Sequence, residues 1–132
     1  MTDAPAQQPT VLVVDDEEDL RDIMRRMLER RGFSTLVAGD SDQAIAVCRD
    51  HDGVIDVLVT DLGLPGASGG ELSRSARALR PHMGVVYISG LPKDIAVTKG
   101  LISDDALLVK KPFTSELLIE ALRLVIAEGA AR

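Results

Sequence analysis

Three carboxylates and one lysine in this sequence are of the types that together hold a hard metal ion. Asp15 and Asp16 follow the apolar run VLVV, Asp61 follows VIDVLVT, and Lys111 follows ALLVK. If these side chains meet, their negative charges repel one another and raise the carboxylate pKa values. Mg²⁺ relieves such repulsion, because it binds carboxylates, a backbone carbonyl and waters in octahedral geometry. The charges then balance: three negative charges stand against two positive charges on Mg²⁺ and one on Lys111.

Apolar segments alternate with amphipathic ones, and this alternation determines where the charged residues lie. Five short apolar segments are predicted to be strands, at residues 11–14, 33–38, 54–60, 84–88 and 106–110. A first helix is predicted to end at Gly32. Its apolar stripe is formed by Leu20, Ile23, Met24, Met27 and Leu28. Four more helices are expected to begin near Asp40, Ser68, Pro92 and Thr114. The helix over residues 92–101 is the weakest, because Thr98 and Gly100 disfavour helix.

Strands that alternate with helices imply a parallel sheet covered on both faces, so the predicted fold class is α/β. Five strands and five helices match the flavodoxin-like doubly wound sheet, a five-stranded parallel sheet in the order 2-1-3-4-5. Its site lies at the carboxyl ends of the neighbouring first and third strands. Asp15, Asp16 and Asp61 are therefore expected to converge there, an interpretation we favour over unrelated helix caps. Asp16→Asn is then expected to relieve a buried repulsion and to stabilise the metal-free protein.

Composition and charge disfavour several classes of protein. The 132 residues carry a net charge of −6, so a basic surface that binds nucleic acid is not expected. The single Cys48 cannot form an internal disulfide and has no Cys/His cluster with which to bind zinc. No apolar run is long enough to span a bilayer, and residues 1–9 lack the pattern of a signal peptide. We therefore expect a cytoplasmic protein without membrane insertion and without direct contact to nucleic acid.

Four motifs at strand ends carry a family resemblance. VLVVDDEEDL, LVTDLGLPGASGGEL, VVYISG and VKKPF occur in this order. Together they resemble the receiver domain of bacterial two-component response regulators, and in particular stand-alone regulators of the chemotaxis type. The receiver domain is expected to cover residues 10–128. Residues 1–9 are expected to form a disordered N-terminal tail, and residues 129–132 a C-terminal tail.

The resemblance implies a role for each matching residue. Asp61 is the expected phosphoacceptor, and the expected ligands of Mg²⁺ are Asp15, Asp16, Asp61 and the backbone carbonyl of Gly63. Ser89 and Lys111 are expected to contact the phosphoryl group, and Gly90 to leave room for it. A cis Lys111–Pro112 peptide bond is expected to turn the lysine into the site, which adds Pro112 to the phosphoryl pocket.

The resemblance also implies a mechanism and a set of partners. A carboxylate oxygen of Asp61 attacks the phosphorus of a phosphohistidine in line, and water later removes the phosphoryl group. The phosphohistidine belongs to a histidine kinase or a histidine phosphotransfer protein, and the signal passes to an unknown downstream protein through a change of conformation. Because the domain catalyses its own phosphorylation and dephosphorylation once per signal, it is not expected to be an enzyme.

Three alternatives remain open at this point. A haloacid-dehalogenase-type phosphatase needs an aspartate two residues after its nucleophile, where this chain has Glu17 and Gly63. A flavin carrier needs a hydroxyl- and glycine-rich phosphate loop, where this chain has DDEED. A degenerate receiver that only binds partners lacks an acidic residue, the hydroxyl or the lysine, and none is lost here. Phosphorylation by a small phosphodonor with Mg²⁺ separates these alternatives from a working receiver.

Two features concern the partner and the output. The first helix carries five arginines, expected to form its solvated face: Arg21, Arg25, Arg26, Arg30 and Arg31. In receivers the exposed positions of this helix also help to dock the kinase or phosphotransfer partner, which is the alternative role for these arginines. Leu108 lies three residues before Lys111, where receivers commonly have Phe or Tyr, so an aromatic ring cannot carry the switch there. The segment from Gly90 to Leu101 is therefore expected to carry the change, since Gly90 permits backbone movement.

Overall fold

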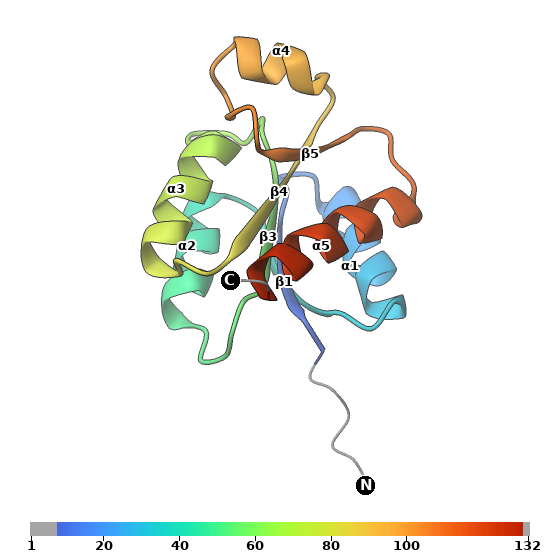
Figure 1. The fold of residues 1–132 in the computed structure, drawn as a ribbon. Helices are drawn as coiled ribbons and strands as arrows, with labels where there is room; N and C mark the ends of the chain where they lie inside the picture. The colour runs from blue at the N-terminus through green and yellow to red at the C-terminus, as the bar shows by residue number, and fades with distance from the viewer. Residues whose placement is uncertain (1–7, 131–132) are drawn as a thin grey trace, which may run out of the picture.

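The computed structural model describes residues 8–130 and confirms the predicted fold class. The strands are β1 (Thr10–Val14), β2 (Ser34–Ala38), β3 (Val57–Asp61), β4 (Gly84–Ser89) and β5 (Leu107–Lys110). The helices are α1 (Glu18–Arg30), α2 (Ser41–Asp50), α3 (Gly69–Leu79), α4 (Lys93–Thr98) and α5 (Ser115–Ala130). The strands form one parallel sheet in the predicted order β2-β1-β3-β4-β5. Figure 1 shows α1 and α5 on one side of the sheet, α2 and α3 on the other, and α4 beyond the end of β4.

The expected tails fall largely outside the described residues, which begin at residue 8 and end at residue 130. Residues 8 and 9 precede β1, and α5 continues to Ala130, past the expected end of the domain at residue 128. No helix among residues 8–130 has the length and apolar character that crossing a membrane requires.

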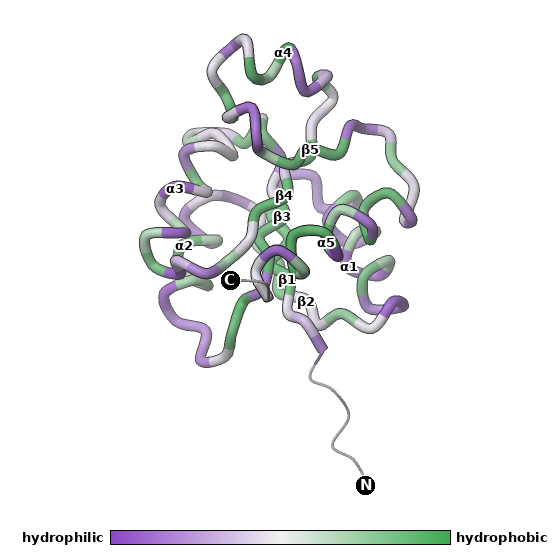
Figure 2. The backbone as a smooth tube through the Cα atoms, viewed as in Figure 1, coloured by the Kyte–Doolittle hydropathy of each residue, from purple (hydrophilic) through white to green (hydrophobic). Residues whose placement is uncertain are grey.

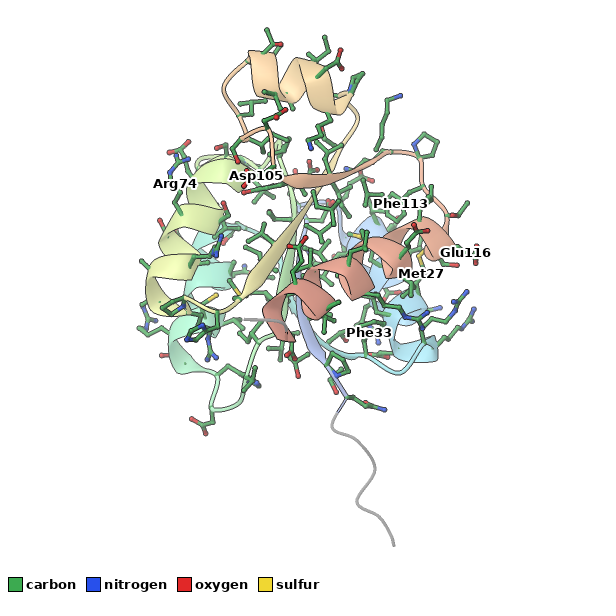
Figure 3. The ribbon with its side chains drawn as sticks, viewed as in Figure 1. Met27, Phe33, Arg74, Asp105, Phe113 and Glu116 are labelled. Carbon is green, nitrogen blue, oxygen red and sulfur yellow. The ribbon has the colours of Figure 1, made fainter. Side chains whose placement is uncertain are left out.

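The central strand β1 explains why the fold needs helices on both faces. Its residues Val11, Leu12, Val13 and Val14 are all fully buried, and successive side chains point to opposite faces. Val11 and Val13 pack with residues of α1 and α5, whereas Leu12 and Val14 pack with residues of α2 and α3. Figure 2 shows the apolar strands running through the middle of the molecule, and Figure 3 shows side chains filling the layers on both sides.

Local sequence signals set the ends of several helices as predicted. Ser68 and Glu71 form both hydrogen bonds of the capping box that begins α3, and the Asp40 side chain caps α2 by accepting from Gln43. Gly32 takes a φ of +89° just after α1, a conformation that favours glycine. Because a Cβ at Gly69 would collide with the carbonyl of Asp61, glycine allows α3 to begin directly against the end of β3.

The structure differs from the sequence-based expectations at several places, of which three concern the helices and strands most. Strand β3 begins at Val57 rather than at residue 54, and Val54 is 68% exposed. Ile23 was expected in the buried stripe of α1 but is 49% exposed, because the buried face centres on Met24 and Leu28. Helix α4 has six residues, since the chain turns back at Gly100, whose φ is +74°.

Arg80, just after α3, links this helix to the C-terminal end of α2, in a part of the fold for which no functional residue is predicted. Its guanidinium donates to the carbonyls of Cys48 at 2.7 Å, His51 at 2.5 Å and Gly53 at 2.8 Å. These carbonyls lie at and after the C-terminal end of α2, where helices leave acceptors unpaired.

Arg80→Met is expected to lower the free energy of unfolding by about 2 kcal/mol, because three acceptors lose a charged donor. Arg77→Met is the matched control, since the exposed side chain of Arg77 makes no hydrogen bond or ion pair within residues 8–130. Urea unfolding of the three proteins measures the difference. Equal losses in the two variants would show that the Arg80 contacts contribute nothing specific.

Candidate functional site

The sheet brings the three predicted carboxylates together at its carboxyl edge. Val14 of β1 pairs with Thr60 of β3, so Asp15 and Asp61 are the next residues on adjacent strands. Asp15, Asp16 and Asp61 each offer an oxygen, and these oxygens lie within 4.8 Å of one another. The convergence expected from the strand order is therefore present in the structure.

Lys111 supplies a positive charge inside this cluster. Its Nζ donates a hydrogen bond of 2.9 Å to Asp61 Oδ2 and lies 3.7 Å from Asp15 Oδ2. Burial lowers the pKa of Lys111, but the hydrogen bond to Asp61 and the charges of Asp61 and Asp15 outweigh burial and raise it overall. The lysine therefore stays protonated at neutral pH. The Lys111–Pro112 bond is cis, as expected, and Pro112 is exposed.

Asp15 is the carboxylate that most needs a further partner. It is 1% exposed, and its Oδ1 accepts from the Glu17 amide at 2.8 Å. Its Oδ2 is buried and has no hydrogen-bond donor within the described residues. Burial raises the pKa of Asp15, and the nearby charges of Asp61 and Asp16 add to this, against the opposing effects of the Glu17 amide and Lys111. A buried oxygen without a donor, in an all-oxygen cluster, fits a hard cation such as Mg²⁺.

The remaining predicted residues surround Asp61. The amide of Gly63 donates to Asp61 Oδ1 at 3.0 Å, so both oxygens of Asp61 have a donor. Ser89 is one residue beyond Ile88, the partner of Asp61 in the sheet, and its carbonyl accepts from the Lys111 amide at 2.8 Å. The buried Ser89 hydroxyl accepts from the Leu91 amide at 3.0 Å. A Cβ at exposed Gly90 would meet no atom within 4 Å apart from its chain neighbours, so the space at Gly90 is open.

Sequence reasoning missed two sets of contacts. Arg21 was assigned to the solvated face of α1, which is wrong, because its Nη1 donates to the Asp15 carbonyl at 2.9 Å and the residue is partly buried. The available signal was its place in the first turns of α1, from which a long side chain reaches back to the strand end. The second contact joins α3 to β4 through a buried hydrogen bond of 2.6 Å between Ser73 and Tyr87, for which the sequence offers no signal.

The burial of Asp15 changes which substitution should stabilise the metal-free protein. Asp16 is exposed, so Asp16→Asn removes no buried charge, and the charge of Asp16 is the smallest of the causes that raise the pKa of Asp15. Asp15→Asn is instead expected to raise the free energy of unfolding in chelator by about 1 kcal/mol. The raised pKa of Asp15 means that ionising this carboxyl opposes folding, and this cost falls as the pH is lowered toward its ordinary value of 3.8.

Chemical unfolding of the parent, Asp15→Asn and Asp16→Asn at pH 7 and pH 5 with chelator checks this prediction. The gain from Asp15→Asn should be larger at pH 7 than at pH 5, and larger than the gain from Asp16→Asn. A parent as stable at pH 7 as Asp15→Asn would contradict the crowding of these carboxylates.

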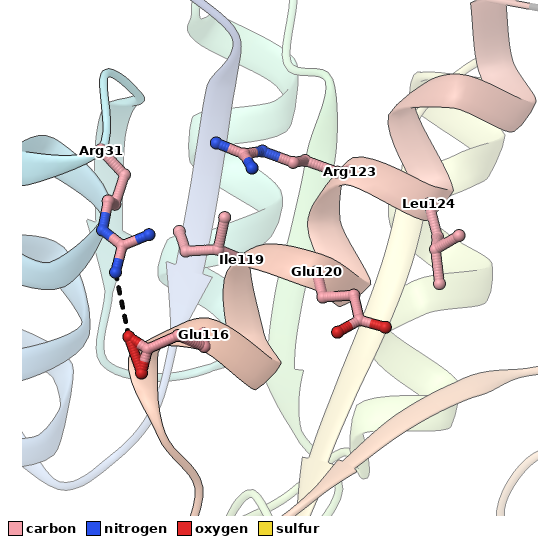
Figure 4. Close-up of a pocket in the computed structure, with 6 residues that line it drawn as sticks. All are labelled: Arg31, Glu116, Ile119, Glu120, Arg123 and Leu124. Carbon is pink, nitrogen blue, oxygen red and sulfur yellow. Dashed lines mark hydrogen bonds and ion pairs between the residues drawn. The ribbon is translucent and has the colours of Figure 1, made fainter.

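Two hollows lie apart from the acidic cluster. A pocket of about 380 Å³ between α1 and α5 contains the ion pair between Arg31 and Glu116 at 3.0 Å, shown in Figure 4. A groove of about 1160 Å³ is lined by residues of α3, β4, β5 and α5. Neither is lined by the carboxylates or by Lys111, so the predicted chemistry belongs to the strand ends and not to a cavity.

Comparison with known protein families gives a match over most of the chain. A family model described as "Response regulator receiver domain" matches residues 11–123. The Sensory transduction protein RegX3 of Mycolicibacterium smegmatis is 34% identical over 92% of this chain and 52% of its own length. The Transcriptional regulatory protein AruR of Pseudomonas aeruginosa is 32% identical over 91% of this chain and 50% of its own length. The chain thus spans about half the length of these curated relatives.

Solved structures agree with this match. A response regulator receiver protein from Sinorhizobium medicae superposes with a TM-score of 0.81 at 30% identity, covering 93% of this chain and 98% of the other. A response regulator receiver domain protein from Clostridium thermocellum gives a TM-score of 0.82 at 27% identity, with the same coverage.

Proposed function

The chain belongs to the response regulator receiver domain family of two-component signalling, and we propose that it is a phosphoryl-accepting switch in which Asp61 takes the phosphoryl group. Receiver domains act as signalling switches and not as classical enzymes. One observation carries the proposal: Asp61 is hydrogen-bonded to Lys111 within a cluster of carboxylates, one of which has a buried oxygen without a donor among residues 8–130. Such a cluster suits a hard cation and an anionic group together.

The residues present fit Mg²⁺ as the resident ion. Its ligands would be the carboxylates of Asp15, Asp16 and Asp61 and the backbone carbonyl of Gly63, together with waters. When bound, Mg²⁺ supplies positive charge that neutralises the negative charge on the oxygens of the transferred phosphoryl group.

The chain's own residues orient and activate Asp61. The Gly63 amide and Lys111 each hold one of its oxygens, so the carboxylate cannot rotate freely. A carboxylate oxygen of Asp61 forms the new bond to phosphorus as the bond to the donor histidine nitrogen breaks, and that nitrogen keeps the electron pair. Lys111 then donates to a phosphoryl oxygen and stabilises its charge.

Three further residues would surround the phosphoryl group once Asp61 carries it. The Ser89 hydroxyl accepts a hydrogen bond from the Leu91 amide, and by turning away from that amide it could donate its own proton to a phosphoryl oxygen. Gly90 leaves open space beside it, and Pro112 follows Lys111 at the exposed border of the pocket. Water later hydrolyses the aspartyl phosphate, so the domain returns to its starting state by its own chemistry.

The donor partner would be a histidine kinase or a histidine phosphotransfer protein, because either presents a phosphohistidine. We place this exchange in the cytoplasm, where such kinases carry their phosphohistidine. The downstream partner would be a protein that distinguishes the two states of the switch. We propose no nucleic-acid contact for the described domain, in keeping with the acidic net charge of −6.

Incubation with acetyl phosphate tests the proposed function without knowledge of the partner kinase. We expect Mg²⁺ to permit one phosphoryl adduct per chain, because three carboxylates then no longer repel the anionic donor. Intact-mass spectrometry measures the adduct, and the same reaction in excess chelator is the control. A protein that takes no adduct with Mg²⁺, or an equal adduct in chelator, would contradict the proposed function.

A further inference from the structure

The carbonyl of Asp15 has an unusual donor at the end of the sheet. The Asp15 amide still donates to the Ala38 carbonyl at 3.3 Å, which extends the ladder between β1 and β2 by one step. Strand β2 ends at Ala38, and the chain then turns through Gly39 into α2. No backbone amide within the described residues donates to the Asp15 carbonyl. Arg21 Nη1 donates to it instead, at 2.9 Å.

The surroundings hold the Arg21 side chain in this place. Its own amide donates to the Glu17 carbonyl at 2.9 Å at the start of α1, so the side chain folds back from the helix over the ends of β1 and β2. A Cβ at Gly39 would lie 3.0 Å from Arg21 Nη1. The glycine therefore leaves the space that the guanidinium fills, and Arg21 is partly buried.

The hydrogen bond bears on Asp16, because the Asp15 carbonyl and the Asp16 nitrogen share one planar peptide unit. Asp15 is held without help from Arg21, by burial, by the Glu17 amide and by Lys111. Asp16 is exposed, and its side chain makes no hydrogen bond or ion pair within residues 8–130. The backbone of this turn is therefore what directs the Asp16 carboxylate toward the cluster.

We propose that Arg21 is a positioning residue for the metal site: by fixing the Asp15–Asp16 peptide it aims the Asp16 carboxylate at the cation. The inference rests on the proposed function, since it concerns the same Mg²⁺ site. Arg21 touches neither the ion nor the phosphoryl group and acts through Asp16 alone. Replacing a residue that orients a metal ligand without touching the metal commonly lowers the affinity for the metal.

The sign of the effect separates positioning from simple charge. Arg21 is a cation near the site, so Coulomb repulsion alone predicts that its removal strengthens Mg²⁺ binding. If Arg21 positions Asp16, its removal weakens Mg²⁺ binding, because a peptide unit that is no longer held lets the Asp16 carboxylate turn into solvent. Arg21→Met removes both the charge and the donor, and its effect on affinity therefore shows which of the two dominates.

The test is a Mg²⁺ titration followed by the chemical shifts of backbone amides near Asp61. Arg21→Met is expected to raise the dissociation constant on the order of tenfold. Arg26→Met is the matched control, because Arg26 lies on the same helix with 66% of its side chain exposed and pairs with Asp22. The control is expected to stay within about twofold of the parent. Equal or tighter binding in Arg21→Met would overturn the inference while leaving the proposed function intact.

A double-mutant cycle then tests whether Arg21 acts through Asp16. In the Asp16→Asn background, Arg21→Met is expected to change the dissociation constant by less than about twofold, because no carboxylate remains to be aimed. A full tenfold loss in that background would overturn the inference, since Arg21 would then act by some other route. A parent protein that binds no Mg²⁺ at all would overturn the proposed function and this inference together.

Discussion

Lys111→Met is expected to slow phosphorylation of Asp61 by acetyl phosphate by a factor on the order of 100 to 1000 at saturating Mg²⁺. Methionine keeps an unbranched side chain but removes the charge and the donor. The reaction adds a dianionic group to a site that already holds three carboxylates, and Lys111 is the cation 2.9 Å from Asp61 Oδ2. The positive charge of Lys111 therefore stabilises the site most as the phosphoryl group approaches.

Lys110→Met provides the matched control for this measurement. Lys110 is the exposed neighbour of Lys111, and within the described residues it makes no ion pair with the acidic cluster. Its replacement is expected to leave the rate within about twofold of the parent. The rates come from the time course of the phosphoryl adduct by intact mass. Equal slowing in both variants, or none in either, would show that Lys111 has no specific role in the phosphorylation of Asp61.

Beryllofluoride with Mg²⁺ is expected to change amide exchange chiefly from Gly90 to Leu101, by on the order of tenfold in rate. The structure supplies a mechanical reason, because the Ser89 hydroxyl accepts from the Leu91 amide. A hydroxyl that turns toward a phosphoryl group releases this amide and frees the segment after it. The short α4 that follows has one buried residue, Ala96, and no side-chain cap, so small changes at its start are easily transmitted.

Hydrogen exchange read by mass spectrometry, with and without beryllofluoride, measures this change. Ser89→Ala is the control, since it removes the acceptor for the Leu91 amide and should make the segment exchange rapidly in both conditions. A smaller effect is expected near Leu108, which lies beside Tyr87 in the sheet. Unchanged exchange from Gly90 to Leu101, with a response in α1 or in residues 63–67, would contradict this route for the signal.

The strand order and the acidic cluster were predictable from sequence because both depend on strong, local patterns. Apolar strands such as VLVV are buried on both faces, and a parallel sheet brings the carboxyl ends of β1 and β3 together. Asp15, Asp16 and Asp61 follow these strands directly, so their meeting required no knowledge of side-chain packing. The capping box of Ser68 and Glu71 was predictable for the same reason.

The contacts that sequence reasoning missed depend on where side chains go after the backbone is placed. Arg21 reads as one of five arginines on a helix, and only the space above Gly39 shows why it folds back to the Asp15 carbonyl. Which of Asp15 and Asp16 is buried depends on how the chain leaves β1, and the periodicity of the sequence does not contain that information. The exposure of Ile23 likewise follows from how α1 sits on the sheet.

The most direct measurement locates the phosphoryl group. The parent and Asp61→Asn are incubated side by side with acetyl phosphate and Mg²⁺, weighed intact, and the modified parent is then fragmented to map the adduct. We expect one adduct on the parent at Asp61 and none on Asp61→Asn, because asparagine cannot form the acyl phosphate. An adduct that persists in Asp61→Asn, or that maps to Asp15 or Asp16 in the parent, would contradict Asp61 as the phosphoacceptor.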